Sequence, residues 1–440
     1  MKKVLLISLG CSKNRVDSEK LLAQITAGGG FEIIPEGTPF DKSGADMVLI
    51  NTCGFITAAK QESIDVILEA CEAKNLGQVG KVYVFGCLSK RYRDELEKSI
   101  PEADGFFGTS DDLALFRALG VEPCAHLALH RKLTTPSHYA YLKISEGCDR
   151  RCSYCAIPFI RGPYRSVPME EIVAEARILA AQGVRELILI AQDTTYYGID
   201  IYGKRRLADL LKMLSDIEGI EWIRIHYMYP ADFPTDVLDV MASDPKICKY
   251  VDIPLQHASD KILNMMHRAA GADSNRRLVD TIREKVPGVV IRTTMIVGHP
   301  GEGEKEFAEL MDFVREMRFE RLGAFTYSEE EGTYDASHYR NDVPEKVKTE
   351  RYDKLMELQS EISKACNLKR IGKDERVIVD AFADGTLTAR SMGESPEVDG
   401  EIYVMGAYPC GFVPASVVGS FMTVRITAAD EYDLYAKTLI

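Results

Sequence analysis

The sequence predicts an α/β protein in three parts: an N-terminal open parallel α/β sheet, a central (βα)6-type barrel and a small C-terminal all-β barrel. Apolar runs alternate with helical periodicity through most of the chain, which predicts parallel sheets. Several of these runs lead directly into cysteine-bearing turns, and the last part instead has short apolar runs split by Gly, Pro and Asp. We expect domains at residues 1–130, 134–366 and 367–440.

The N-terminal part repeats one pattern three times. Its apolar runs are Lys3–Ser8, Met47–Ile50 and Val82–Phe85, and the cysteines that follow them are Cys11, Cys53 and Cys87. Helical periodicity comes after each, near Ser18–Thr26, Ile56–Ala73 and Arg91–Lys98. Ligands of open parallel sheets lie beyond the carboxyl ends of the strands, so we expect the three cysteines to converge there.

Six further strand–helix units predict the partial or complete central barrel. The expected strands are Tyr139–Ile144, Glu186–Ala191, Trp222–His226, Tyr250–Ile253, Val289–Ile296 and Arg321–Phe325. A charged helix near Pro344–Arg370 follows them. Short runs at Arg376–Phe382, Leu387–Arg390, Glu401–Val404 and Met422–Ile426 then predict a five-stranded barrel.

Composition limits the class of protein. The 440 residues are 46% hydrophobic and 28% charged, which is ordinary for a globular chain, and no apolar run approaches the roughly 18 residues of a membrane span. We therefore expect a cytoplasmic protein with neither membrane nor DNA as a partner. The net charge of −13 argues against broad nucleic-acid binding and suits a basic protein partner. Eleven cysteines in such a chain favour metal ligands over disulfides.

The strongest motif is Cys148-Asp-Arg-Arg-Cys152-Ser-Tyr-Cys155, which follows a predicted strand. Thiolates are the usual ligands of iron–sulfur clusters, and three ligands on a four-iron cube leave one iron open for a small molecule. A structural zinc site is the alternative. Such a site needs a fourth ligand, usually from a second paired Cys or His motif, and none lies nearby in the sequence.

This motif, with Tyr154 before its third cysteine, resembles the radical S-adenosylmethionine (SAM) superfamily. The resemblance implies a [4Fe-4S] cluster whose open iron binds SAM, and one-electron cleavage of SAM to a 5′-deoxyadenosyl radical. It places the cofactor at loops after the predicted strands, which makes Gln192, Asp193, Gln256 and Gly298 candidate SAM-binding residues. Each of them could instead only close its turn.

A three-cysteine domain ahead of such a barrel resembles the methylthiotransferase family, and the C-terminal barrel resembles its TRAM domain. The resemblance implies that Cys11, Cys53 and Cys87 hold a second [4Fe-4S] cluster that carries the sulfur to be inserted. Three buried thiols are the plain alternative. The remaining cysteines receive no predicted chemistry: Cys71, Cys124, Cys248, Cys366 and Cys410.

Three short sequence segments resemble one branch of that family, the branch that modifies an aspartate of small-subunit ribosomal protein twelve. The segments that resemble it are Ser8–Asn14, Asn51–Ile56 and Phe325–Thr333. The transfer-RNA branch usually has Gln-Met where this chain has Ser12-Lys13, and Ser-Val where it has Gly54-Phe55. The resemblance implies methylthio insertion at the β-carbon, two SAM consumed per turnover, a sulfur donor, and an electron donor such as flavodoxin or ferredoxin. We predict no side-chain acid or base.

Two other functions stay open: a transfer-RNA (isopentenyl-adenosine) methylthiotransferase, and a non-catalytic iron–sulfur scaffold or redox sensor. The C-terminal segment carries a net charge of −6 from Gly372 onward, counted as five bases and eleven acids. We expect this barrel to dock a basic ribosomal protein through acids that include Glu394, Glu397, Asp399 and Glu401. A solvated acidic face that only keeps the protein soluble is the alternative.

Overall fold

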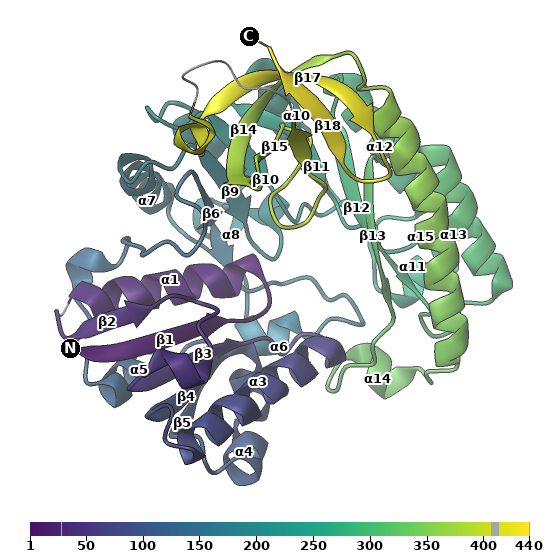
Figure 1. Ribbon diagram of the computed structural model, residues 1–440. Helices are drawn as coiled ribbons and strands as arrows, with labels where there is room; N and C mark the ends of the chain where they lie inside the picture. The colour runs from purple at the N-terminus through teal and green to yellow at the C-terminus, as the bar shows by residue number, and fades with distance from the viewer. Residues whose placement is uncertain (28, 406–412, 440) are drawn as a thin grey trace.

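The N-terminal part is a five-stranded parallel sheet with helices on both faces (Figure 1). The computed structural model describes residues 1–27, 29–405 and 413–439. The strands are β1 (Lys2–Ser8), β2 (Phe31–Ile34), β3 (Met47–Thr52), β4 (Lys81–Gly86) and β5 (Gly105–Phe107), in the order β2-β1-β3-β4-β5. The helices are α1 (Ser12–Ala27), α2 (Phe40–Ser43), α3 (Thr57–Asn75), α4 (Cys87–Ser99) and α5 (Asp112–Leu119).

Alternation of side chains along the strands gives this sheet two cores. Leu5, Val48 and Val84 pack against α3 and α4, whereas Val4 and Leu49 pack against α1 and α5. Successive side chains of a strand point to opposite faces, so strands covered on both sides read as the continuous apolar runs seen in the sequence.

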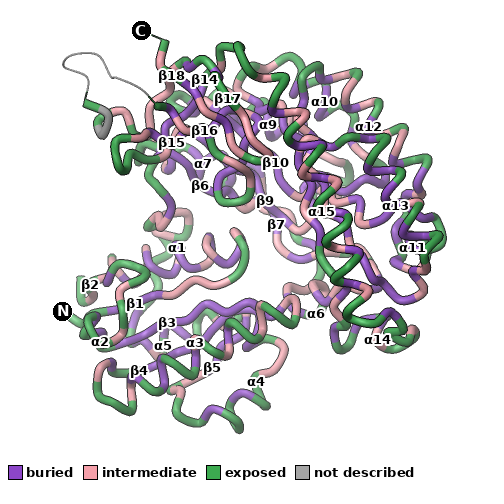
Figure 2. The backbone as a smooth tube through the Cα atoms, turned by 45° about the vertical axis from the view of Figure 1, so that its right-hand side comes forward, coloured by how far each residue is buried: buried purple, intermediate pink, exposed green. Residues whose placement is uncertain are grey.

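The central part is a six-stranded parallel sheet in the order β13-β12-β11-β10-β9-β6, which forms the predicted (βα)6-type barrel as an open, partial one. Its strands are β6 (Tyr139–Lys143), β9 (Glu186–Ile190), β10 (Trp222–Ile225), β11 (Ile247–Asp252), β12 (Val290–Val297) and β13 (Arg321–Thr326). The main covering helices are α7 (Met169–Ala181), α9 (Leu207–Ser215), α10 (Thr235–Ser243), α12 (Ala272–Lys285), α13 (Glu304–Met317) and α15 (Glu345–Leu368). Figure 2 shows the strands buried and the outer sides of these helices exposed.

The C-terminal part is the expected closed barrel of five strands, with an apolar interior. The strands are β14 (Asp374–Ala383), β15 (Thr386–Arg390), β16 (Ile402–Val404), β17 (Phe421–Ala429) and β18 (Leu434–Thr438). Cys410 lies outside the described residues. No helix among the described residues is both long and apolar enough to cross a membrane.

The C-terminal barrel packs on the face of the six-stranded sheet opposite its helices. Trp222 of β10 and Tyr250 of β11 join Ile378 of β14 in one buried cluster, and the Trp222 ring lies 4.8 Å from that of Phe421. The barrel therefore covers part of the inner face of the partial barrel. Figure 1 shows the two parts lying against each other.

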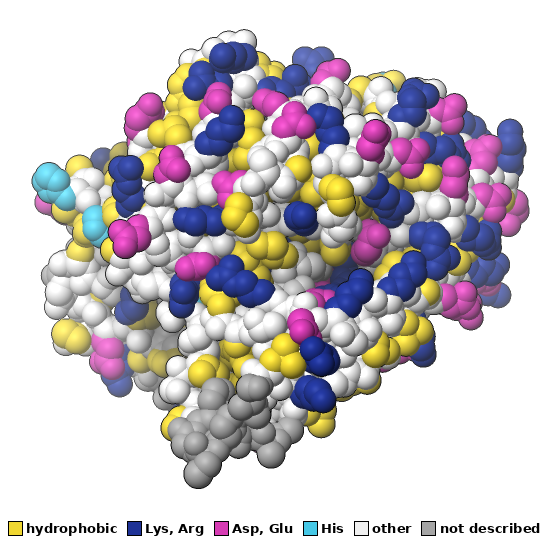
Figure 3. Space-filling view, turned by 90° about the horizontal axis from the view of Figure 1, so that it is seen from above, with side chains coloured by type: hydrophobic (Ala, Val, Ile, Leu, Met, Phe, Trp, Pro, Cys, Tyr) yellow, Lys and Arg dark blue, Asp and Glu magenta, His cyan; other side chains and the backbone are white. Residues whose placement is uncertain are grey.

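This packing corrects the expectation of an acidic docking face. Glu394 is buried and ion-paired to Arg321 at 3.0 Å, and the Asp399 carboxylate, also withdrawn from the surface, accepts a hydrogen bond from the Tyr250 hydroxyl at 2.6 Å. These two acids bind the barrel to the central sheet, so counting them as surface charge is wrong; Glu397 and Glu401 remain exposed. Figure 3, seen from this side, shows Lys and Arg mixed with Asp and Glu over the surface.

Candidate active site

Cys11, Cys53 and Cys87 are here called the N-terminal triad. The loop that carries Cys11 packs against the loop of Cys53, which in turn packs against Cys87. A Cβ added at Gly10 would lie 2.7 Å from the Cys53 Cβ. One added at Gly54 would lie 2.9 Å from the carbonyl carbon of Cys87. The carboxyl ends of β1, β3 and β4 thus bring together three cysteines that are far apart in the sequence, as the strand pattern predicts.

Burial favours the protonated form of two of these thiols, those of Cys53 and Cys87. Desolvation by burial is the largest cause that raises the pKa of Cys87 to about 12, with Arg161 opposing it and the neighbouring thiols adding to it; burial likewise raises the pKa of Cys53. Without a metal ion these thiols stay protonated at neutral pH. Metal ligands must be deprotonated, so a bound iron would take the place of the protons.

Asn14, which sequence reasoning missed as a site residue, lies fully buried beneath the triad. Its Nδ2 donates to the carbonyls of Leu9 and Thr52, each at 3.0 Å, and so ties the ends of β1 and β3 together. Its Oδ1 accepts from the Cys87 thiol at 3.6 Å and from Arg161 of α6 (Ile157–Arg161). The only sequence signal was its place in the segment Ser8–Asn14.

Cys148, Cys152 and Cys155, here called the central triad, occupy one loop after β7 (Ser145–Glu146). The backbone N–H of Arg150 donates to the Cys148 sulfur at 3.4 Å, and the Arg268 guanidinium donates to the Cys152 sulfur at 3.5 Å. Burial raises the pKa of Cys148 to about 12 and raises that of Cys155 as well.

Two guanidinium groups flank this loop. Arg150 and Arg268 both stack on the Tyr229 ring, at 4.1 and 4.2 Å from its centroid. Both place positive charge next to sulfur atoms, which favours thiolates and an anionic cluster. Neither arginine was singled out from the sequence: Arg150 lies within the motif but is not a thiol, and Arg268 reaches the loop from the segment after α11 (Asp260–Met265).

Two of the four predicted SAM-binding residues carry a buried oxygen with no protein partner among the described residues: Oε1 of Gln192 and Oε1 of Gln256. Buried polar atoms are normally hydrogen-bonded, so both oxygens fit a site for a polar cofactor. Gln192 is itself positioned by donating through Nε2 to Glu146 at 3.2 Å. These two acceptor oxygens fit the implied cofactor.

The other two residues have partners of their own. Asp193 accepts from Arg150 at 2.8 Å through one carboxylate oxygen and from Thr195 through the other. A Cβ on Gly298, whose φ is +76°, would lie 2.3 Å from Cγ of Lys348. Their contact with SAM stays a prediction, since packing alone accounts for both.

The two triads face each other across the domain boundary. Cys87 packs against Ala156 and Ile160, just beyond the central triad. Among the described residues no three His, Cys, Asp or Glu side chains gather around a point suited to one metal ion. Thiolates of a four-iron cluster each bind a different iron and need not meet at one point.

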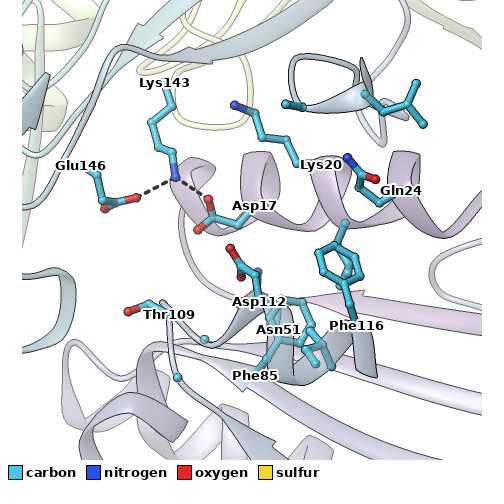
Figure 4. A pocket seen from close by; sticks show the side chains of 16 residues that line it. Asp17, Lys20, Gln24, Asn51, Phe85, Thr109, Asp112, Phe116, Lys143 and Glu146 are labelled. Atoms are coloured by element: carbon cyan, nitrogen blue, oxygen red, sulfur yellow. Dashed lines mark hydrogen bonds and ion pairs between the residues drawn. The ribbon is translucent and has the colours of Figure 1, made fainter. Parts of the chain in front are cut away.

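A cleft of about 320 Å³ lies beside this boundary, between α1, α5 and the end of β6 (Figure 4). Lys143 forms ion pairs with Asp17 and with Glu146 across it. Burial raises the pKa of Asp17, but Lys143 and Arg161 together lower it to about 2. These pairs join α1 to the ends of β6 and β7, which lead into the loop that carries the central triad.

Comparisons with known proteins agree with this architecture. The family model of the Radical SAM superfamily matches residues 142–314, that of the Uncharacterized protein family UPF0004 matches 3–108, and that of the TRAM domain matches 371–439. Among solved structures, the radical SAM methyltransferase TsrM from Kitasatospora setae is 14% identical, with a TM-score of 0.54 over 74% of this chain and 72% of its own. That likeness shows the fold. The fold and the central match define a radical SAM protein.

Full-length relatives give the family within that class. "Ribosomal protein uS12 methylthiotransferase RimO" of Porphyromonas gingivalis is 50% identical over 99% of this chain and 98% of its own length. The protein of the same name from Cytophaga hutchinsonii is also 50% identical, over 99% and 97%. A third, from Bacteroides thetaiotaomicron, is 47% identical over 100% and 98%. The chain belongs to this family of radical SAM methylthiotransferases.

Proposed function

We propose that this protein inserts a methylthio group at the β-carbon of an aspartate of uS12, the small-subunit ribosomal protein expected from the sequence. The N-terminal and central triads each hold one [4Fe-4S] cluster, and two SAM molecules are used per turnover. When bound, the clusters and SAM supply the radical, the sulfur and the methyl group. The observation that supports this most is the contact of Cys87 with α6, which brings two three-thiol sites to one boundary.

The chain's own residues act by binding and positioning. Asn14 and Arg161 hold the strand ends of the N-terminal triad, and Arg268 donates to the sulfur of Cys152. The β-carbon of an aspartate is not activated for proton removal, so a side-chain acid or base would contribute little. Holding two reacting groups in the correct geometry contributes much more.

The remaining parts of the proposal follow from the family. A sulfur donor and a reductant such as flavodoxin or ferredoxin complete the reaction, and the protein works in the cytoplasm. We place the domain boundaries as expected from the sequence, at 1–130, 134–366 and 367–440, since Arg131 in the first linker is buried against Glu19 and Glu175.

An anaerobic assay with two readouts tests this function. Reconstituted protein, SAM, sulfide and a reductant are incubated with purified uS12 or with transfer RNA, and 5′-deoxyadenosine and methylthiolated product are measured by mass spectrometry. Wild type should form both with uS12. The Cys11/Cys53/Cys87→Ala variant should cleave SAM without transferring sulfur, and the Cys148/Cys152/Cys155→Ala variant should do neither. If methylthiolated product formed on transfer RNA and not on uS12, transfer RNA would be the substrate.

A further inference from the structure

Lys13, in the first turn of α1, has a largely buried side chain, and no carboxylate among the described residues pairs with its ammonium group. The residue is only 7% exposed. Its Nζ lies 3.1 Å from the centre of the Tyr227 ring. In the described parts of the chain, no hydrogen-bond acceptor or acidic side chain pairs with this Nζ, so the ring is its one recorded partner.

Lys13 differs in this from the other buried cations of the chain. Those that form an ion pair with a carboxylate are Arg131, Arg224, Arg321, Lys348, Arg351 and Arg390. The remaining one, Arg268, donates to the Cys152 sulfur. A cation–π contact compensates for only part of the loss of water around a largely buried lysine side chain. An anion bound from outside the chain would make up the difference.

The position of Lys13 suits the acceptor side chain. It follows Cys11 by two residues, and Tyr227 stands just beyond the end of β10. The Tyr227 carbonyl accepts from the backbone N–H of Thr194, in the same loop as Gln192. The ammonium therefore lies between the N-terminal triad and the loop proposed to bind SAM, where a carbon that reacts with both must lie.

The backbone holds this arrangement under strain. Tyr227 has a φ of 58°, in the left-handed region that favours glycine. Its N–H donates to the buried carboxylate of Asp252 at 2.9 Å, which fixes the strained residue. Strain of this kind persists where the surrounding structure enforces it, and it is concentrated at ligand sites.

We propose that Lys13, supported by the Tyr227 ring, binds the side-chain carboxylate of the acceptor aspartate and selects an acidic acceptor. This rests on the proposed function, because it requires uS12 as the substrate. The contact orients the β-carbon, which is bonded to that carboxylate, between the two triads. A charge-assisted hydrogen bond of this kind is worth about tenfold or more in affinity.

The test compares binding of wild type, Lys13→Met, Lys13→Arg and Lys81→Met. The probes are purified uS12 and uS12 with its acceptor Asp replaced by Asn, under anaerobic conditions. Lys81 is the matched control, since it also lies over a tyrosine, Tyr83, at 6.0 Å, but is exposed and starts β4. Iron content and SAM cleavage confirm that each variant is folded and loaded.

Wild type and Lys81→Met should bind the Asp form about tenfold or more tightly than the Asn form. Lys13→Met should bind both forms equally weakly, and Lys13→Arg should keep part of the preference. A Lys13→Met variant that discriminates as well as wild type would overturn the assignment of Lys13 alone. Wild type that neither binds nor modifies uS12 would overturn the proposed function, and the Lys13 assignment with it.

Discussion

At the scale of single residues, sequence reasoning identified the cysteines but not the side chains that hold them. Cysteines stand out because they follow apolar runs with a glycine beside them, or stand close together in one motif. Asn14, Arg161 and Arg268 are polar residues with no such signal. They meet the cysteines only because strand ends separated by many residues converge, as when Arg161 reaches Asn14 on α1.

Iron content tests the two triads separately. We expect about eight irons per chain after anaerobic reconstitution, if each triad holds a four-iron cluster. Replacing either triad by Ala should leave about four. Cys248→Ala, a buried cysteine in β11 without predicted chemistry, should keep about eight and serves as the control. A wild-type content of four that the N-terminal replacement does not change would contradict a second cluster.

At the scale of elements, apolar runs predicted the strands that lead to the site. They did not predict β2 and β5, because Phe31–Ile34 is short and includes a glutamate, and Gly105–Phe107 has only three residues. Helix α1 begins at Ser12, well before the expected Ser18–Thr26. Its first turns bury the polar Lys13 and Asn14, so apolar periodicity could not mark its start.

The close packing of the loops predicts that Gly54→Ala disrupts the N-terminal triad. The new Cβ would lie 2.8 Å from the backbone nitrogen of Leu88, and a backbone cannot move aside as a flexible side chain can. We expect loss of the iron held by this triad, measured by iron content, with SAM cleavage retained. Gly30→Ala has nothing within 4 Å of its Cβ and should behave as wild type. Full iron content in Gly54→Ala would show that the loop adapts.

At the scale of the whole molecule, the charge of the C-terminal segment was counted correctly from the sequence, but two of its acids, Glu394 and Asp399, do not lie on the surface as expected. The partners of its buried acid Glu394 come from elsewhere in the chain: Arg321 lies on β13, and Arg370 follows α15. Composition cannot reveal such pairs. The barrel's buried acids therefore stabilise the assembly of the central and C-terminal parts.

A buried histidine at this interface makes the stability depend on pH. His226 lies against the Ser395 hydroxyl at 2.9 Å. Burial lowers its pKa to about 3; Asp252 opposes this shift, and the charges of Arg224, Arg292 and Lys13 add to it. The unfolded chain takes up a proton below about pH 6.5 and the folded chain does not, so stability is full above that pH and falls as pH decreases toward 3.

We expect the free energy of unfolding at pH 5 to be lower than at pH 7 by about 2 kcal/mol from this group. Trp222, the one tryptophan of the chain, lies at the same interface and reports its opening by fluorescence during chemical denaturation. His226→Gln should lose this part of the pH dependence. If the pH dependence of the free energy of unfolding were the same in His226→Gln as in wild type, groups other than His226 would be its cause.

The most direct test of the account is mass spectrometry of uS12 and of transfer RNA from cells with and without the gene for this protein. The account predicts that an aspartate of uS12 carries a methylthio group in the parent cells, that the group is absent when the gene is deleted, and that the wild-type gene restores it. Transfer-RNA modification should be the same in both. A uS12 that stays fully modified in the deletion, or a loss confined to transfer RNA, would contradict the account.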